Sequence, residues 1–200
     1  MRLSFRVALG CAAIATLAAC GAPAPAPQDK YYRLAVEQPA NPTAAPIFDG
    51  IIEVGRFIAD GQVAGRPIIF VDPASPLQLN EHAYHFWNQP PAVMIQEQMI
   101  SFLRAANASN TVVTPDMRVS PDMTLQGRIL KLERMTGASP SAVLELELGL
   151  VKSPDDTLVF LDRYSVQLDA GGSTVADSVI ALNDGLAVLF EQFLQDLRNI

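Results

Sequence analysis

The chain has 200 residues, half of them hydrophobic, and it carries 21 acidic against 14 basic residues for a net charge of −7. This charge argues against a nucleic-acid partner, because duplex binding needs clustered lysine and arginine. It also disfavours electrostatic capture by anionic lipid headgroups.

The first 19 residues have the pattern of a signal peptide. Arg2 and Arg6 give a basic start, and apolar residues 7–16 follow. This run fits the ~7–15 residues of a signal-peptide core and is shorter than the ~20 needed to cross a bilayer. It ends in Leu-Ala-Ala-Cys (17–20), which resembles the bacterial lipobox, in which the cysteine is acylated and becomes the first residue of the mature chain.

Cys20 is therefore the expected lipid-attachment residue, carrying diacylglycerol and an N-terminal acyl chain; no other cofactor is expected. Gly21, rather than aspartate, follows it and favours sorting to the outer membrane, with the body in the periplasm. An ordinary secretory cleavage after Ala19, leaving Cys20 as a free thiol, is the alternative. Loss of residues 1–19 removes Cys11 and leaves 12 basic against 21 acidic residues, so the mature chain would have a net charge of −9 and no disulfide.

Residues 20–30 form a lipidated Pro/Ala-rich tether, and residues 31–200 form one domain. The sequence GAPAPAPQD favours extended polyproline geometry at ~3.1 Å per residue, or about 25–30 Å in all. A second proline-rich patch, Pro39–Pro46, is expected to be a surface loop between two strands. A domain of this length buries about 70% of its unfolded surface.

The first half of the domain should contain two strands and a helix. In 50–59, Ile52, Val54 and Ile58 share one face of a mostly buried strand, and 67–71 form a second strand, joined to it as a hairpin across 60–66. Pro91 suits the first turn of a helix that reaches Asn107. Its apolar stripe consists of Ile95, Met99, Phe102 and Ala106.

The second half predicts a meander of three strands and a closing helix. Residues 123–133, 142–150 and 158–168 are strand-like, and the last two alternate apolar and polar positions around a turn at 153–156. Residues 175–197 follow helical spacing after a cap by Thr174 and Asp177, and Gly185 weakens this helix by about 1 kcal/mol relative to alanine. The fold class is α+β: two layers, a mainly antiparallel sheet covered by two amphipathic helices.

The polar clusters point to structure more than to chemistry. His82 and His85, beside Glu81, could share a metal if they lay on a helix, but their aromatic neighbours favour packing, and no metal site is expected. Asp155 and Asp156 fit a solvated turn. Glu145 and Glu147 fit the wet face of a strand. No nucleophile or nucleotide motif is present, so no catalytic residue and no enzyme activity are expected.

An aromatic cluster is the best candidate for a binding site. Tyr84, Phe86 and Trp87 precede Pro90-Pro91 and a helix that carries Met94. One interpretation is that these side chains fill the junction between sheet and helix. The other is that part of the cluster docks a partner or an acyl chain, because exposed aromatic side chains concentrate binding energy.

Several short motifs carry a family resemblance. They are YYRL (31–34), GIIEVGRF (50–57), GRPIIF (65–70), YHFWNQPP (84–91) and MTLQGRILKLER (123–134), together with the lipobox and the closing helix. In their order and spacing, the chain resembles the ABC-type transport auxiliary lipoproteins, the PqiC-like family. Members usually have a basic residue immediately before the tryptophan, whereas this chain has Phe86 there.

The resemblance implies a non-enzymatic partner of an Mce-type ABC phospholipid transport system. Its expected partners are an Mce-domain protein with its permease and ATPase or a related membrane protein, with phospholipid and a second copy of the chain as further candidates. A lipopolysaccharide-assembly lipoprotein, which would partner an outer-membrane barrel, is one alternative. A periplasmic enzyme with a polar cleft and strongly shifted carboxylates is the other.

Overall fold

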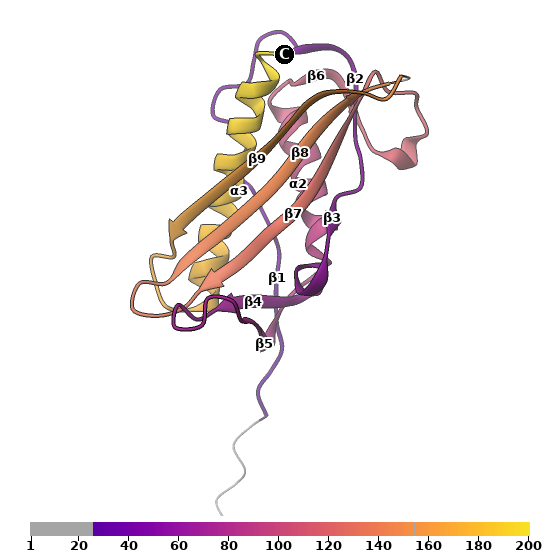
Figure 1. Ribbon diagram of the computed structural model, residues 1–200. Helices are drawn as coiled ribbons and strands as arrows, with labels where there is room; N and C mark the ends of the chain where they lie inside the picture. The colour runs from indigo at the N-terminus through magenta and orange to yellow at the C-terminus, as the bar shows by residue number, and fades with distance from the viewer. Residues whose placement is uncertain (1–25, 154) are drawn as a thin grey trace, which may run out of the picture.

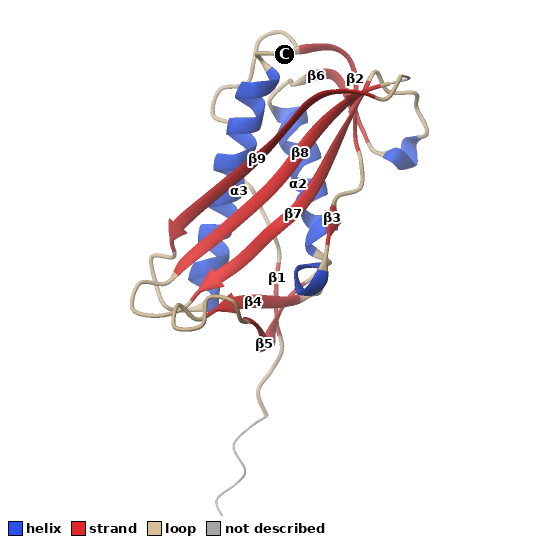
Figure 2. Ribbon diagram, viewed as in Figure 1, coloured by secondary structure: helices blue, strands red, loops and turns tan. Residues whose placement is uncertain are grey.

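The computed structural model describes residues 26–153 and 155–200, so the signal peptide, Cys20 and tether residues 20–25 lie outside the described residues. The described part forms one mixed sheet and two long helices (Figures 1 and 2). Its strands are β1 (Lys30–Tyr32), β2 (Phe48–Val54), β3 (Ile58–Ala59), β4 (Pro67–Val71), β5 (Leu79–Trp87), β6 (Ser109–Val113), β7 (Met123–Met135), β8 (Ser141–Lys152) and β9 (Thr157–Asp169). The helices are α2 (Pro91–Ala105) and α3 (Val175–Leu197), with short 3-10 turns η2 (Gly61–Ala64) and η3 (Pro115–Met117).

The antiparallel meander β7–β8–β9 is the longest part of the sheet, as the alternating sequence predicts. Leu144, Leu146 and Leu148 are fully buried on one face. On the other face, Glu145 accepts ion pairs from Lys131 on β7 at 3.0 Å and from Arg163 on β9 at 3.3 Å. The acidic positions are therefore neutralised across strands rather than simply solvated, and β8 is central rather than at an edge.

The predicted hairpin across residues 60–66 is wrong. Strands β2, β3 and β4 all pair with β7 in parallel, at 123–125, 128–129 and 133–135 in turn. They form one interrupted strand along the same edge of β7, because the intervening turn η2 moves the chain forward without reversing it. The predicted common face of Ile52, Val54 and Ile58 is not continuous either: Ile52 and Val54 are buried, whereas Ile58 is exposed.

Phe57 explains where that face breaks. Its ring occupies the place that a Cβ at Gly127 would need. Phe57 is therefore buried in the core, and the next residue, Ile58, is exposed. Gly127 on β7 thus permits a close aromatic contact inside the sheet that a larger residue would prevent.

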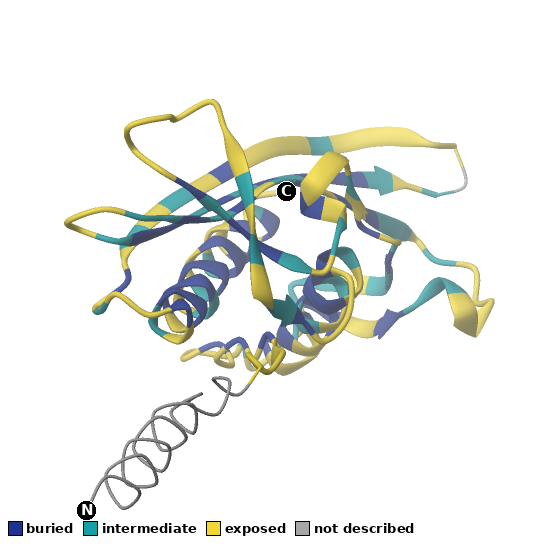
Figure 3. Ribbon diagram, turned by 90° about the horizontal axis from the view of Figure 1, so that it is seen from below, coloured by how far each residue is buried: buried dark blue, intermediate teal, exposed yellow. Residues whose placement is uncertain are grey.

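The two helices cover one face of the sheet, which confirms the two-layer α+β prediction. Buried positions concentrate between helices and sheet (Figure 3), and they include the whole expected stripe of α2. Thr174 and Asp177 form a reciprocal capping box at the start of α3. A Cβ at Gly185 would lie 2.6 Å from Leu144 Cδ1, so this glycine lets α3 approach β8 closely.

An extended segment after β1 runs over the helices. Leu34 and Val36 are buried, the Ala35 N–H donates to Asn183 Oδ1 at 2.6 Å, and the Val36 N–H donates to Gln98 Oε1 at 2.8 Å. The chain entry is thereby fixed to both helices. Pro39–Pro46 lies, as expected, between two strands, β1 and β2.

Among the described residues, neither helix combines the length and apolarity needed to cross a membrane.

Candidate functional site at the tether end

Strands β1, β4 and β5 form the end of the body at which the tether leaves it (Figure 1). β5 pairs antiparallel with β4, and β1 pairs with β5 in parallel, so that Tyr31 lies beside Phe86 and Tyr32 beside Trp87. The strand expected before Pro39 is β1, whereas β5 was not predicted from the sequence. The aromatic residues of 84–87 therefore lie on a strand.

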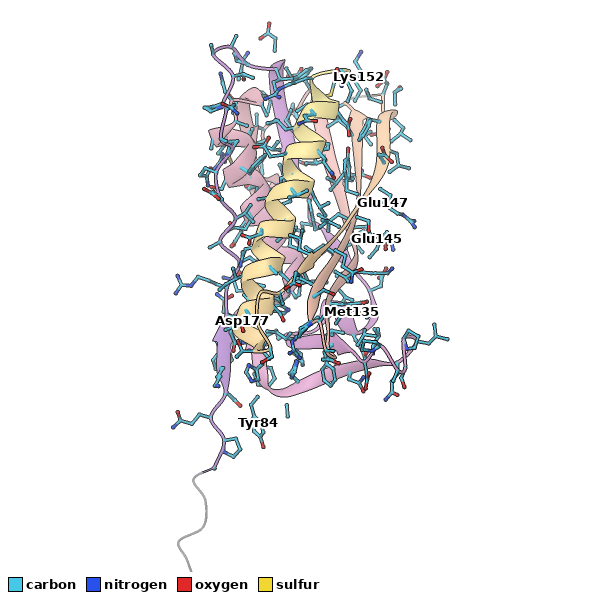
Figure 4. The ribbon with its side chains drawn as sticks, turned by 90° about the vertical axis from the view of Figure 1, so that its left-hand side faces the viewer. Tyr84, Met135, Glu145, Glu147, Lys152 and Asp177 are labelled. Atoms are coloured by element: carbon cyan, nitrogen blue, oxygen red, sulfur yellow. The ribbon has the colours of Figure 1, made fainter. Side chains whose placement is uncertain are left out.

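The structure separates the four candidate docking residues. Trp87 and Met94 lie in the hydrophobic core, with Trp87 only 1% exposed. Tyr84 is 44% exposed and Phe86 is half-buried. Figure 4 shows Tyr84 at the tether end of the body. Only Tyr84 and Phe86 are therefore placed where a partner or lipid could touch them.

The two histidines come together because β5 is irregular. Pro67 pairs with Phe86 but Ile69 pairs with Glu81, so β5 contains extra residues that bulge out of the ladder. The bulge places the rings of His82 and His85 with their centroids 5.5 Å apart. The His85 Nδ1 and the Tyr32 hydroxyl share a 2.8 Å hydrogen bond, which ties β1 to β5.

Burial and neighbouring cations keep this histidine pair neutral. Burial, followed by the charge of Arg134, lowers the pKa of His82 to about 4. Burial and Lys30 also lower the pKa of His85. In the described part of the chain, no three histidine, cysteine, aspartate or glutamate side chains are arranged to hold a metal, so Glu81 does not complete a site with the histidines.

Arg134 is a buried cation that was not predicted from the sequence. Its Nε donates to Ser178 Oγ at 3.0 Å and its Nη2 donates to the Ser173 carbonyl at 2.6 Å, which joins β7 to the start of α3. Burial lowers its pKa, and Asp177 opposes this effect. The one available signal was its place beyond Leu132 on the inward side of β7, but a charged residue there is uncommon.

The remaining polar candidates have structural partners. Asp155 accepts a hydrogen bond from the Thr157 N–H within the β8–β9 turn. Asp156 in the same turn has a φ of 53°. Tyr164 donates to Asp196 Oδ2 at 2.7 Å; burial and this bond raise its pKa. Asp155 thus bonds within its own turn, and Tyr164 joins β9 to α3.

A shallow hollow lies on the sheet face opposite the helices. Its volume is about 500 Å³, and its apolar lining includes Ile58, Leu158 and Leu161 around Gly149. Leu161 approaches the position that a Cβ at Gly149 would take, at 3.2 Å, so the absence of that side chain shapes the floor. The hollow is a second surface that could receive an apolar group.

The fold and these sites define a small α+β domain whose polar clusters join its strands, turns and helices. The chain belongs to the family of ABC-type transport auxiliary lipoprotein components, whose sequence model matches residues 32–193. This match confirms the resemblance seen in the motifs. A search of curated proteins gave no match.

Solved structures share the fold at low sequence identity. Protein XCC0632 from Xanthomonas campestris has a TM-score of 0.73 at 19% identity, covering 82% of this chain and 92% of that one. A PelC dodecamer from Paraburkholderia phytofirmans has a TM-score of 0.51 at 12% identity, covering 80% of this chain and 94% of that one. Both comparisons support the fold assignment.

Proposed function

We propose that the protein is a non-enzymatic outer-membrane lipoprotein, anchored through lipid on Cys20, that serves an Mce-type ABC phospholipid transport system from the periplasm. The observation that carries the proposal is the family match, which spans nearly the whole folded body. In this role the body docks an Mce-domain assembly driven by an inner-membrane permease and ATPase, or by a related membrane protein. The same match favours transport over lipopolysaccharide assembly.

The chemistry of the described residues supports a binding role. A hydrolytic enzyme would gather a shifted acid or base in a polar cleft. Here the lowered pKa of Asp177 arises from its hydrogen bonds to the helix cap Thr174. The pKa of Glu133 is raised by burial, against the nearby Lys131. Asp177 thus caps α3 and Glu133 lies on β7, so these two shifted carboxyl groups do not form a common acid–base pair.

Tyr84 and Phe86 are the proposed contact residues of the site, toward either lipid or a protein partner. They lie on the accessible side of β5, whereas Trp87 and Met94 support the strand from the core. Self-association is a further part of the proposal, because in the described residues β9 pairs only with β8 and leaves one edge free. The PelC structure of similar fold is a dodecamer.

Affinity capture tests the proposal. The lipidated protein, extracted from membranes in mild detergent after cross-linking, should retain the Mce-domain protein encoded beside it, and membrane fractionation should place it with the outer membrane. A Cys20→Ala variant is the matched control, because it removes the anchor and leaves residues 30–200 unchanged. Capture of lipopolysaccharide-assembly proteins instead, with no Mce-domain protein, would overturn the assignment.

A further inference from the structure

Four large apolar or aromatic side chains are exposed along the tether end of the body, spread over the length of β5 and the loop before it. We call them the basal surface: Tyr31, Leu77, Leu79 and Tyr84. They come from β1, from β5 and from the loop between β4 and β5, which lies at the end where the tether leaves (Figures 1 and 4). Leu77 is 98% exposed.

The loop that carries Leu77 is a fixed turn. The Ser75 N–H donates to the Asp72 carbonyl at 2.8 Å, the Ala74 N–H donates to Asp72 Oδ1 at 2.9 Å, and the Gln78 N–H donates to the Ser75 carbonyl at 2.9 Å. Pro73 and Pro76 further restrict the backbone. The turn therefore presents Leu77 to the surroundings instead of folding it back onto the body.

Tyr31 is likewise held in place at the base of the tether. Its ring centroid lies 5.9 Å from that of Phe86, and the Arg66 guanidinium lies 5.4 Å from the ring centroid. Tyrosine rings of this kind, apolar on the body and polar at the tip, suit the boundary between lipid and water. Arg66 is the cation beside this ring, but negative charge surrounds it: Asp29 accepts a hydrogen bond from the Tyr31 hydroxyl at 3.3 Å, Asp72 caps the Leu77 turn, and Glu81 is exposed on β5.

The short tether decides what meets the basal surface. Nine residues, 21–29, separate Cys20 from β1, and an extended chain reaches at most ~3.3–3.6 Å per residue, or about 30 Å. An anchor at Cys20 therefore keeps this end of the body within about 30 Å of the bilayer. At such a high effective concentration, a few apolar contacts are enough to seat the body on the membrane.

We infer that the basal surface rests on the lipid headgroup layer of the anchoring membrane, with Leu77 inserted among the lipids and the tyrosines at the boundary. The inference rests on the proposed lipid anchor at Cys20 and names the lipid surface as the partner of the Tyr84 site. Because the mature chain is acidic, the contact is apolar and aromatic, and added salt should leave it in place. The opposite end of the body then points into the periplasm, free for a protein partner.

Site-specific fluorescence tests this orientation. Lipidation occupies Cys20 and processing removes Cys11, so Leu77→Cys provides the single free thiol for an environment-sensitive dye. Met117→Cys is the matched control, because Met117 is also an exposed apolar side chain, at 54%, but lies in η3 before the start of β7, whereas β4 pairs with the other end of β7. The lipidated proteins are bound to vesicles of phosphatidylethanolamine with phosphatidylglycerol as the minor lipid.

The expected result is a blue-shifted, several-fold brighter dye at position 77 that is quenched by spin-labelled lipid and unaffected by salt, and an unshifted dye at position 117. Vesicle flotation distinguishes a failure of the lipid anchor from a failure of the basal-surface contact. Protein that floats while the dye at position 77 stays in water overturns the basal-surface inference and leaves the anchor standing. Protein that does not float overturns the anchor at Cys20 and, with it, the inference. A Leu77→Asp, Leu79→Asp double variant should still float but lose protection of Tyr84 from quenching and labelling reagents.

Discussion

Replacing Trp87 by alanine should destabilise the body much more than replacing Tyr84, three residues earlier on β5. Trp87 is 1% exposed and belongs to the core, whereas Tyr84 is 44% exposed at the tether end. Truncating a buried tryptophan removes its transfer free energy and leaves a cavity, which costs about 3–5 kcal/mol. Removing an exposed side chain changes stability by about 0.5 kcal/mol.

The difference should be large enough to measure by thermal melting. A domain of this size loses about 2–4 °C of melting temperature per kcal/mol, so Trp87→Ala should melt about 6–20 °C below the wild type. Tyr84→Ala should melt within about 2 °C of it. Far-ultraviolet circular dichroism is the suitable probe, because Trp87 is the only tryptophan and its fluorescence is lost in the variant.

A conservative variant sharpens the comparison. Trp87→Phe keeps most of the buried volume and should fall between the wild type and Trp87→Ala. Equal melting temperatures for Trp87→Ala and Tyr84→Ala would refute the assignment of Trp87 to the core. A fully stable Trp87→Ala variant with impaired partner binding would instead return Trp87 to the docking surface.

Three further predictions concern the sheet, the anchor and pH. Leu146→Asp places an unpaired charge in the core and should cost several kcal/mol of stability and unfold the body. Glu147→Lys, at the half-exposed outer face beside Arg163, should cost about 0.5–1 kcal/mol. Similar denaturant midpoints for the two variants would contradict the assignment of the two faces of β8. Cys20→Ala should abolish acyl labelling, and an intact mass showing an unmodified wild-type Cys20 would contradict the anchor. Because the folded pKa of His82 is about 4 and its ordinary value is 6.5, the unfolded chain takes up a proton first. The contribution of His82 to the free energy of unfolding should thus be fully present above about pH 6.5. It should fall by about 1–2 kcal/mol towards pH 4, after allowance for partial solvent access. His82→Gln should reduce this pH dependence, and an unchanged pH profile in that variant would contradict the pKa assignment.

The local sequence pattern was sufficient to predict several elements and their buried faces. The alternation around Leu146 predicts β8 and its buried face, and the spacing of Ile95 and Met99 predicts the buried stripe of α2. The Thr174 cap could be recognised because both of its partners lie within one helical turn. In each case, the residues that determine the structure are close together in the sequence.

The features that could not be predicted depend on contacts between residues that are far apart in the sequence. β4 could be recognised as a strand, but its pairing with Glu133–Met135, rather than with the chain just before it, is a long-range choice. The bulge in β5 hides the alternation of Tyr84–Trp87, so the sequence did not show which of these side chains faces the core. Likewise, the burial of Arg134 depends on acceptors from the start of α3.

Direct binding between purified components tests the central claim most closely. The lipidated protein in detergent, with wild-type residues throughout, should bind the Mce-domain protein encoded beside it in a saturable manner, and unlabelled protein should compete. The unfolded Leu146→Asp variant serves as the negative control. Saturable binding would support the role as an auxiliary component of Mce-type transport, whereas no binding by a wild-type protein that melts cooperatively would contradict it.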